Sequence, residues 1–361
     1  MGSGEGGPEL SVVVPTFNER DNIEELIRRI EEALKGVRFE VVVVDDNSPD
    51  GTAEVAAELG RLYGNVRVVR RPGKLGLGSA VVDGISASKA DVIAVIDADL
   101  QHPPELLPVM LNRVREGYDL VVASRLIDGG GTRGWSAFRK LVSRAAGCIA
   151  RLALPRARRI RDVMSGYFMF RRRVLDGVEL RPRGFKVLLE LVVKGSWARV
   201  SEVPYVFKPR RRGSSKLTLG EAAAYLRHVL ELSGYRPLKF AAVGALGAVV
   251  NEALLLALAP LLPLHLAGSA SIEASILSNF AINDSWTFKD RRAGRWAARC
   301  AKYHAAVALG ALVNYATLLA LSLAGVHYLV ANLLGILLGF IANYLVSEHF
   351  VWRVAAWPGE G

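Results

Sequence analysis

The sequence predicts two parts of different character: an α/β domain with an open sheet, followed by an all-α domain of membrane-spanning helices. Its 361 residues exceed one ordinary domain of about 150 residues. The mean hydropathy is positive, +0.24, although 22% of the residues are charged, so the two kinds of residue must be separated along the chain. Residues 240–288 and 303–352 contain no Lys or Arg, whereas the first 239 residues mix charged and apolar stretches.

The α/β prediction rests on short β-branched runs that alternate with amphipathic stretches. Residues 11–15 (SVVVP) and 40–46 (EVVVVDD) flank a stretch, 22–34, whose apolar residues recur at helical spacing. Such alternation predicts a parallel sheet with helices on both faces and with ligands at the carboxyl ends of its strands. The pattern continues with strands at 66–70, 91–96 and 119–124 and with helices at 52–63, 79–88 and after Pro103.

The membrane prediction rests on four apolar segments, each near the roughly 20 residues that a spanning helix needs. They form a duplicated hairpin, because residues of the first two segments match residues of the last two at shifts of 63 and 64, as Asn251 matches Asn314 and Asn279 matches Asn343. The segments lie at 240–262, 266–288, 303–324 and 327–352.

The orientation follows from the connecting loops. The 289–302 loop carries six Lys or Arg and Arg353 follows the last segment, whereas the 260–267 and 325–327 turns hold neither residue type. By the positive-inside rule, both termini, the middle loop and the α/β domain lie in the cytoplasm. The first ten residues have no apolar core, so we expect no signal peptide. The sequence therefore predicts an integral membrane protein with four spans.

The net charge of +11 does not indicate nucleic-acid binding, because the basic residues flank apolar segments. Residues 208–239 carry eight Lys or Arg against Glu221 and Glu231, a placement that suits anionic lipid headgroups. The helical stretch 217–232 within them lies either on the membrane surface or against the soluble domain. Cys148 and Cys300 are too few and too distant for a disulfide framework or a metal site.

The most informative stretch is 97–105 (DADLQHPPE), directly after a predicted strand. Asp97 and Asp99 emerge at the ligand edge of the sheet, and Gln101 adds a neutral oxygen. Together they make a partial shell of hard oxygen ligands for Mg²⁺ or Mn²⁺, which keeps open positions for substrate phosphates. The alternative is a turn that caps a helix beginning near Pro103, and both roles can coexist.

Two more polar turns follow the first and second predicted strands, at 15–19 (PTFNE) and 45–51 (DDNSPDG). These turns share one crevice in an open α/β sheet, where Glu19 and Asp46 could accept hydrogen bonds from a base or a ribose. Capping of the following helices accounts for Asn18 and Asp50 but leaves Glu19 and Asp46 without a role.

These motifs resemble those of glycosyltransferase family 2, with its GT-A fold, and in particular the dolichol-phosphate mannosyltransferases of that family. The duplicated apolar region resembles the GtrA-type membrane domain that some members carry. The motifs that carry the resemblance are VVPTFNE (13–19), VVDDNSPDGT (43–52), KLGLGSAVVDG (74–84), DADLQHPPE (97–105), SR (124–125), RKLVS (139–143), SGYFMF (165–170), GFKVLLE (184–190) and RRRGSSKL (210–217).

The resemblance implies a role for individual residues. Metal binding falls to Asp97, Asp99 and Gln101, and lipid-phosphate binding to Arg125, Arg139 and Ser143, which with Asp99 form the catalytic set. Phe17 stands where the family usually has Tyr, so ring packing is kept and a hydroxyl contact is lost. Binding of the donor nucleotide-sugar falls to Pro15, Phe17, Glu19, Val44, Asp46, Asp97, Ala98, Asp99, Gln101, Arg125, Phe185, Lys186, Arg210 and Lys216.

The resemblance further implies a metal-dependent transfer of mannose from GDP-mannose to a dolichyl or other polyprenyl phosphate, inverting to a β-linked product. A phosphate acceptor is already ionised, so no general base is needed. A polyprenyl-phosphate glucosyltransferase that uses UDP-glucose needs the same metal and arginines, and a lipid-linked sugar flippase or scaffold is a further alternative. For the basic residues alone, the alternative is a solvated surface charge.

The expected domain boundaries follow from the motifs and the apolar segments. Residues 10–207 form the catalytic domain, 208–239 a basic linker with its helix, and 240–353 the four-helix membrane domain. Residues 1–9 and 354–361 are expected to be tails.

Overall fold

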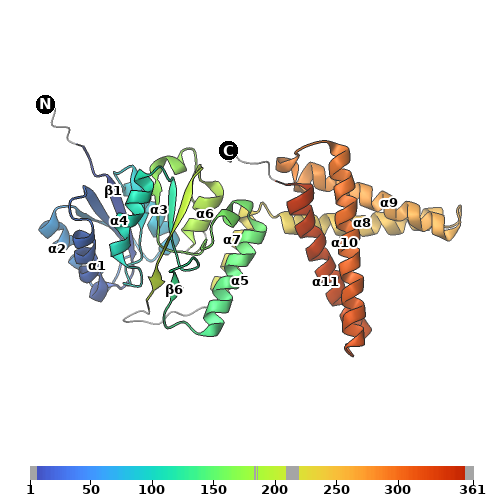
Figure 1. Ribbon diagram of the computed structural model, residues 1–361, viewed down its shortest axis with the longest axis horizontal. Helices are drawn as coiled ribbons and strands as arrows, with labels where there is room; N and C mark the ends of the chain where they lie inside the picture. Colours follow the sequence, from blue (N-terminus) through green and yellow to red (C-terminus); the bar gives the residue numbers. More distant parts are fainter. Residues whose placement is uncertain (1–5, 183, 185, 209–218, 354–361) are drawn as a thin grey trace. The chain divides into compact units, whose positions relative to one another are not determined.

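The computed structural model (Figure 1) describes residues 6–182, 184, 186–208 and 219–353. The chain divides into two compact units, residues 1–232 and 233–361. The division separates the α/β part from the apolar helices.

The first unit is built on a seven-stranded sheet in the order β3-β2-β1-β4-β7-β5-β8. Most neighbours are parallel, as predicted, but β7 runs antiparallel to both β4 and β5. The sheet is therefore mixed, and the prediction of a wholly parallel sheet is wrong at this strand. The strands are β1 Leu10–Thr16, β2 Phe39–Asp45, β3 Val66–Arg70, β4 Val92–Val95, β5 Leu120–Ser124, β7 Phe168–Arg171 and β8 Val200–Pro204. A separate parallel pair joins β6 Gly131–Thr132 to β9 Val206–Phe207.

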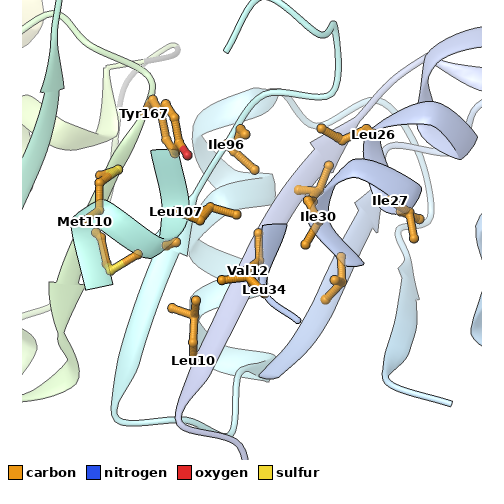
Figure 2. Packing of buried hydrophobic residues seen from close by; sticks show 14 of the residues in the cluster. Leu10, Val12, Leu26, Ile27, Ile30, Leu34, Ile96, Leu107, Met110 and Tyr167 are labelled. Carbon is orange, nitrogen blue, oxygen red and sulfur yellow. The ribbon is translucent and has the colours of Figure 1, made fainter. Parts of the chain in front are cut away.

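Both faces of the sheet are covered, which explains the long apolar runs within the strands, such as residues 12–14 of β1 and 41–44 of β2. Successive side chains of a strand point to opposite faces. Val12 of β1 accordingly packs in one core, with α1 and α4, whereas Val13 packs in the other, with α3 and α6. Figure 2 shows the first core, in which α1 and α4 side chains meet β1. The helices and 3₁₀ turns are α1 Arg20–Ala33, α2 Thr52–Tyr63, α3 Leu77–Ala87, η1 Pro104–Leu106, α4 Leu107–Arg115, α5 Ala137–Ala153, η2 Pro155–Arg159, η3 Arg172–Leu175, α6 Val187–Lys194 and α7 Leu219–Leu232.

Helix α7 belongs to the first unit. Val229 lies in the second core, and the Tyr225 hydroxyl donates a hydrogen bond of 2.6 Å to the Ala146 carbonyl of α5. Of the two alternatives for the stretch 217–232, the described part therefore fits packing against the soluble domain.

The second unit consists of two helical hairpins, in which α8 packs on α9 and α10 packs on α11. Among the described residues, three helices are long and apolar enough to cross a membrane: Arg236–Leu258, Trp296–Leu323 and Tyr328–Val351. The predicted second span, 266–288, lies largely in helix α9, Leu264–Ile282. The 19 residues of this helix include Glu273 and several serines, which lower its hydropathy. The helices and turns are α8 Arg236–Leu258, α9 Leu264–Ile282, η4 Asn283–Thr287, η5 Lys289–Arg291, α10 Trp296–Leu323, α11 Tyr328–Val346 and η6 Ser347–Val351.

The duplication predicted from the sequence recurs as matched π-helical turns, η4 and η6, at the ends of α9 and α11. Each turn carries one buried acid, Asp284 in the first and Glu348 in the second. The two acids are 64 residues apart, which is the shift of the repeat.

Each of these acids binds an arginine of the other hairpin. Asp284 accepts hydrogen bonds from Arg299 Nε at 2.8 Å and Nη2 at 3.0 Å, and from Trp352 Nε1 at 2.8 Å. Glu348 pairs with Arg291, and its Oε1 lies 3.9 Å from Arg236 Nη1. Arg236 and Arg299 are themselves 63 residues apart. The two hairpins are thus joined by reciprocal ion pairs between equivalent positions.

We expect Asp284→Ala to destabilise the second unit by about 3–5 kcal/mol, because the substitution leaves the guanidinium of Arg299 buried without its carboxylate. The thermal unfolding midpoint of the full chain in detergent measures this. The matched control is Asp290→Ala, since Asp290 also pairs with an arginine but has a side chain that is 53% exposed. The control should cost about 0–1 kcal/mol. Equal losses in the two variants would contradict the role given to Asp284.

Candidate active site

The predicted metal-binding turn follows β4 at the carboxyl edge of the sheet. Leu100, in the middle of the turn, has φ of +58°, a backbone conformation that non-glycine residues rarely adopt. The turn is closed by hydrogen bonds from Gln101 N to Asp99 Oδ1 at 3.1 Å and from Gln101 Nε2 to the Lys208 carbonyl at 2.8 Å. Because the amide nitrogen of Gln101 donates to Lys208, its amide oxygen points the other way. The structure thus brings Asp97, Asp99 and Gln101 together on one turn.

The carboxylate of Asp97 is held from two sides. Its Oδ2 lies 3.1 Å from Nε2 of His102, whose side chain is 2% exposed. A Cβ atom added at Gly166 would lie 2.9 Å from the same Oδ2, so any residue larger than glycine would displace the carboxylate. The ring of His102 is enclosed by three aromatic rings with centroids within 5.4 Å, those of Tyr167, Tyr205 and Phe207.

Arg125, at the end of β5, forms a paired hydrogen bond with a buried carboxylate. Its Nε and Nη2 donate to Asp162 Oδ2 and Oδ1, both at 2.8 Å, and its backbone N donates to Oδ2 at 2.9 Å. Burial opposes the charged form of Arg125, but the hydrogen bonds and the charge of Asp162 raise its pKa. Arg125 therefore stays charged in a buried place.

Lys186 precedes α6, and its Nζ donates to the Met164 carbonyl at 3.0 Å. Burial, with the nearby charge of Arg125, lowers the pKa of Lys186 to about 8, while Asp97 and Asp162 act in the opposite direction. Lys186, Arg125, Asp97 and Asp162 thus form one cluster of opposed charges at the edge where β4 and β5 end.

The crevice predicted between the turns after β1 and β2 is organised by its own acids. Asp46 binds Arg71 and accepts a hydrogen bond from Gly76 N at 2.8 Å, so its carboxylate ties the 71–76 loop to the end of β2. Asp50 accepts from Arg20 N at 3.1 Å and from Thr52 N at 3.0 Å, the first residues of α1 and α2. The carboxylate of Asp50 therefore accepts hydrogen bonds from backbone N–H groups at the amino ends of two helices.

Glu19 and Phe17 lie on the turn after β1. Glu19 accepts a hydrogen bond from Asn22 Nδ2 at 2.7 Å, and its backbone N donates to Thr52 Oγ1 at 3.0 Å. The Nζ of Lys74 lies 3.9 Å from the centroid of the half-buried Phe17 ring. The side chains of Pro15, Val44 and Ala98 are buried in the unit, so only their backbone can face a ligand.

Arg139 and Ser143 lie on α5, four residues apart and both half-buried. The Cζ atom of Arg139 lies 4.3 Å from the Trp135 ring, which also lies 5.4 Å from Cζ of Arg125. Trp135 thus links the two arginines predicted to bind the lipid phosphate. Phe185, Arg210 and Lys216 lie outside the described residues.

Comparison with known proteins agrees with this architecture. The family model "Glycosyl transferase family 2" matches residues 11–178, and the model "GtrA/DPMS, transmembrane domain" matches residues 239–352. A dolichol-phosphate mannosyltransferase of Pyrococcus furiosus is 45% identical over 350 residues, which cover 95% of this chain and 99% of that protein. This chain belongs to the dolichol-phosphate mannosyltransferase family. It is a glycosyltransferase with a GT-A fold and a GtrA-type membrane domain.

Two further matches cover a smaller share of this chain. A dolichol-phosphate mannosyltransferase of Saccharomyces cerevisiae is 33% identical over 236 residues, 62% of this chain and 86% of that protein. Among solved structures, glucosyl-3-phosphoglycerate synthase of Mycobacterium tuberculosis has a TM-score of 0.47 at 25% identity, covering 63% of this chain and 81% of that chain.

Several residues of the site were not assigned a role from the sequence. The sequence pattern indicates no role for Asp162, Gly166 or Arg71, and it does not indicate the contact between His102 and Asp97. The sequence does contain a feature that could have indicated Asp162. It is an acid at the end of an arginine-rich run, 156–161, and it stands three residues before the family motif at 165–170. Only the fold shows that these residues touch Arg125, Asp97 and Asp46.

We expect Gly166→Ala to lower transferase activity about 100-fold, because the added Cβ displaces the carboxylate of Asp97. Initial rates of sugar transfer by the purified full chain measure this. The control is Gly131→Ala, where an added Cβ meets no atom within 4 Å. Near-normal activity of Gly166→Ala, with the thermal midpoint unchanged, would show that the position of Asp97 is not critical.

Proposed function

We propose that the enzyme transfers mannose from GDP-mannose to a dolichyl or other polyprenyl phosphate, giving β-linked lipid-phosphate mannose and GDP. The observation that carries the proposal is the cluster at the ends of β4 and β5, where the charged Arg125 and Lys186 lie near the acidic turn. Two anions, a sugar diphosphate and a lipid phosphate, must be held together in this reaction. The full-length relative of Pyrococcus furiosus is named dolichol-phosphate mannosyltransferase, which supports mannose and a lipid phosphate as the transferred group and the acceptor.

We place a divalent cation, Mg²⁺ or Mn²⁺, on Asp97, Asp99 and Gln101. Two carboxylates and one amide oxygen on a closed turn are the hard oxygen donors that these ions prefer. Such an ion would neutralise the diphosphate and stabilise it as a leaving group. His102 orients Asp97, and the hydrogen bond from Gln101 N orients Asp99, so the chain presets the donor atoms.

The donor nucleotide is assigned to the crevice between β1 and β2. Phe17, with Lys74 over its ring, offers a flat apolar surface beside Glu19. Asp46 shapes this crevice because it fixes the 71–76 loop, and its carboxylate is also proposed to bind the nucleotide. Phe185, Lys186, Arg210 and Lys216 are proposed to close over the diphosphate, which places Lys186 at the boundary of donor and acceptor.

The acceptor phosphate is assigned to Arg125, Arg139 and Ser143. A phosphate monoester is ionised near neutral pH, so attack on the anomeric carbon requires positioning and no proton transfer. Displacement in a single step inverts the configuration at that carbon. The guanidinium groups of Arg125 and Arg139, both beside Trp135, supply charge and paired donors for the phosphate oxygens.

Exposed apolar residues on helix α5 support the proposal that the acceptor is bound to a membrane. Phe138 and Leu141 are 72% and 64% exposed, and Ile149 and Leu152 continue the exposed stripe along the helix. An apolar stripe on a helix that also carries Lys and Arg suits the boundary of lipid and water. We further propose that the second unit crosses the membrane four times, with the catalytic domain and both termini in the cytoplasm.

Donor assays test the function directly. Membranes containing the full chain are incubated with polyprenyl phosphate and either labelled GDP-mannose or labelled UDP-glucose. We expect label in the lipid fraction from GDP-mannose alone, since the family relatives are mannosyltransferases. Label from UDP-glucose alone would replace mannose by glucose in the proposal. Membranes that lack the chain are the control for endogenous activity.

Removal of divalent cations by EDTA should abolish transfer, and Mg²⁺ or Mn²⁺ should restore it. Asp99→Asn should lower the rate at least 100-fold, because the amide that replaces the carboxylate cannot neutralise a cation. The control is Glu105→Gln, a change in the same motif at an exposed carboxylate that binds Arg29. Transfer that survives EDTA at its full rate would refute the metal assignment.

A further inference from the structure

The segment that contains Asp162 lies directly beneath the arginine assigned to the acceptor phosphate. The side chain of Asp162 is fully buried, and that of Arg125 is 9% exposed. The three hydrogen bonds between the two residues, at 2.8 to 2.9 Å, take up both carboxylate oxygens. Charge-assisted paired bonds of this kind fix the direction of a guanidinium as well as its charge.

Asp162 is in turn anchored to the sheet. Glu202 of β8 accepts hydrogen bonds from the backbone N of Arg161 at 2.8 Å and of Asp162 at 3.0 Å. Strand β8 is parallel to β5, and Glu202 pairs with Val122, three residues before Arg125. The carboxylate and the arginine are therefore held by neighbouring strands, so neither can shift without the other.

Two aromatic rings restrict the guanidinium further. Its Cζ atom lies 5.4 Å from the Trp135 ring and 5.6 Å from the Phe207 ring. Weak hydration allows a guanidinium to lie against such rings while it remains charged. With its edge bound to Asp162 and these rings beside it, Arg125 has little freedom to turn.

A guanidinium has five N–H groups, and Asp162 occupies those of Nε and one of Nη2. The remaining Nη2–H and the two Nη1–H groups form a second fork, which no residue in the described part of the chain occupies. The spacing of such a fork matches two oxygens of a phosphate.

We propose that Asp162 is a positioning residue for the acceptor: it holds Arg125 so that the second fork faces the lipid phosphate. This inference rests on the proposed function. Asp162 does not touch the reacting atoms, and it acts through Arg125. Because the arginine is oriented before the substrate arrives, little conformational freedom is lost when the phosphate binds.

The test is the steady-state kinetics of Asp162→Asn in the full chain, with polyprenyl phosphate and the sugar nucleotide varied in turn. The amide keeps one acceptor oxygen but places an NH₂ group against the guanidinium. We expect KM for polyprenyl phosphate to rise about 10-fold to 100-fold, from the loss of one charge-assisted bond. KM for the sugar nucleotide should stay within about twofold. A purely structural role would impair both substrates alike and would overturn the proposal.

A double-variant cycle shows whether Asp162 acts through Arg125. In the Arg125→Lys background, where the fork is absent, Asp162→Asn should change KM for polyprenyl phosphate by less than about threefold. Equal effects in both backgrounds would overturn the proposal. The control is Glu54→Gln, which removes an exposed acid that pairs with Arg70 and should leave both KM values unchanged.

Glu202→Gln keeps the inference testable if Asp162→Asn does not fold. Glutamine has one acceptor oxygen for the two backbone N–H groups, so the anchor of Asp162 is loosened while its carboxylate remains. We expect a smaller rise of KM for polyprenyl phosphate in the same direction, and an unchanged KM would overturn the inference. Kinetics are measured with whichever sugar nucleotide the wild type uses, so a wrong donor would refute the proposed function and leave this test intact.

Discussion

The antiparallel strand β7 determines how the charged groups of the active site meet. It lies between β4 and β5, and the segment before it, 162–167, therefore crosses the edge at which those two strands end. From this segment come the carboxylate of Asp162 under Arg125, the Met164 carbonyl that binds Lys186, and Gly166, which makes room for Asp97. If β7 were parallel to β4 and β5, its other end, at Arg171, would lie at this edge in place of the 162–167 segment.

Burial of charge is the second constraint, and both units meet it in the same way. A buried ion is costly unless a counter-ion and hydrogen bonds compensate the lost hydration. Arg125 has Asp162 in the first unit, and Arg299 has Asp284 in the second. In the first unit the pair leaves donors of the arginine available for a substrate. In the second unit the pairs join one hairpin to the other, and the duplication places them at equivalent positions.

The proposed sites for the nucleotide, the cation and the acceptor lie at different strand ends, and the direction of the strands explains why. Acids at the end of β2 shape the crevice given to the nucleotide, the acidic turn after β4 is given to the cation, and the arginine after β5 is given to the acceptor. The carboxyl ends of β2, β4 and β5 share one edge because these strands run in the same direction, with antiparallel β7 between the last two. In the proposed function, the order of these strands in the sheet is the order of donor, metal and acceptor.

Much of this was predictable from local pattern. The β-branched runs, the helical spacing of apolar residues and the acidic motif after β4 gave the α/β architecture and the candidate metal ligands Asp97, Asp99 and Gln101, whereas Arg125 became a candidate only through the family resemblance. The residues that support them were not predictable in this way. Asp162 lies 37 positions from Arg125, so their contact depends on how two distant segments cross. His102 is only five positions from Asp97, and the contact between them depends on the three-dimensional course of the turn that joins them.

The sequence by itself determined the division into a charged and an apolar half, the strand and helix succession and the duplication, since each depends on neighbouring residues and their spacing. The tertiary structure alone decided that β7 is antiparallel, that Asp46 binds the 71–76 loop, and that arginines and acids pair across the two hairpins. The physical reason is the same in each case. Hydrogen bonds and ion pairs between remote residues depend on the distances that packing of the hydrophobic cores sets between their segments.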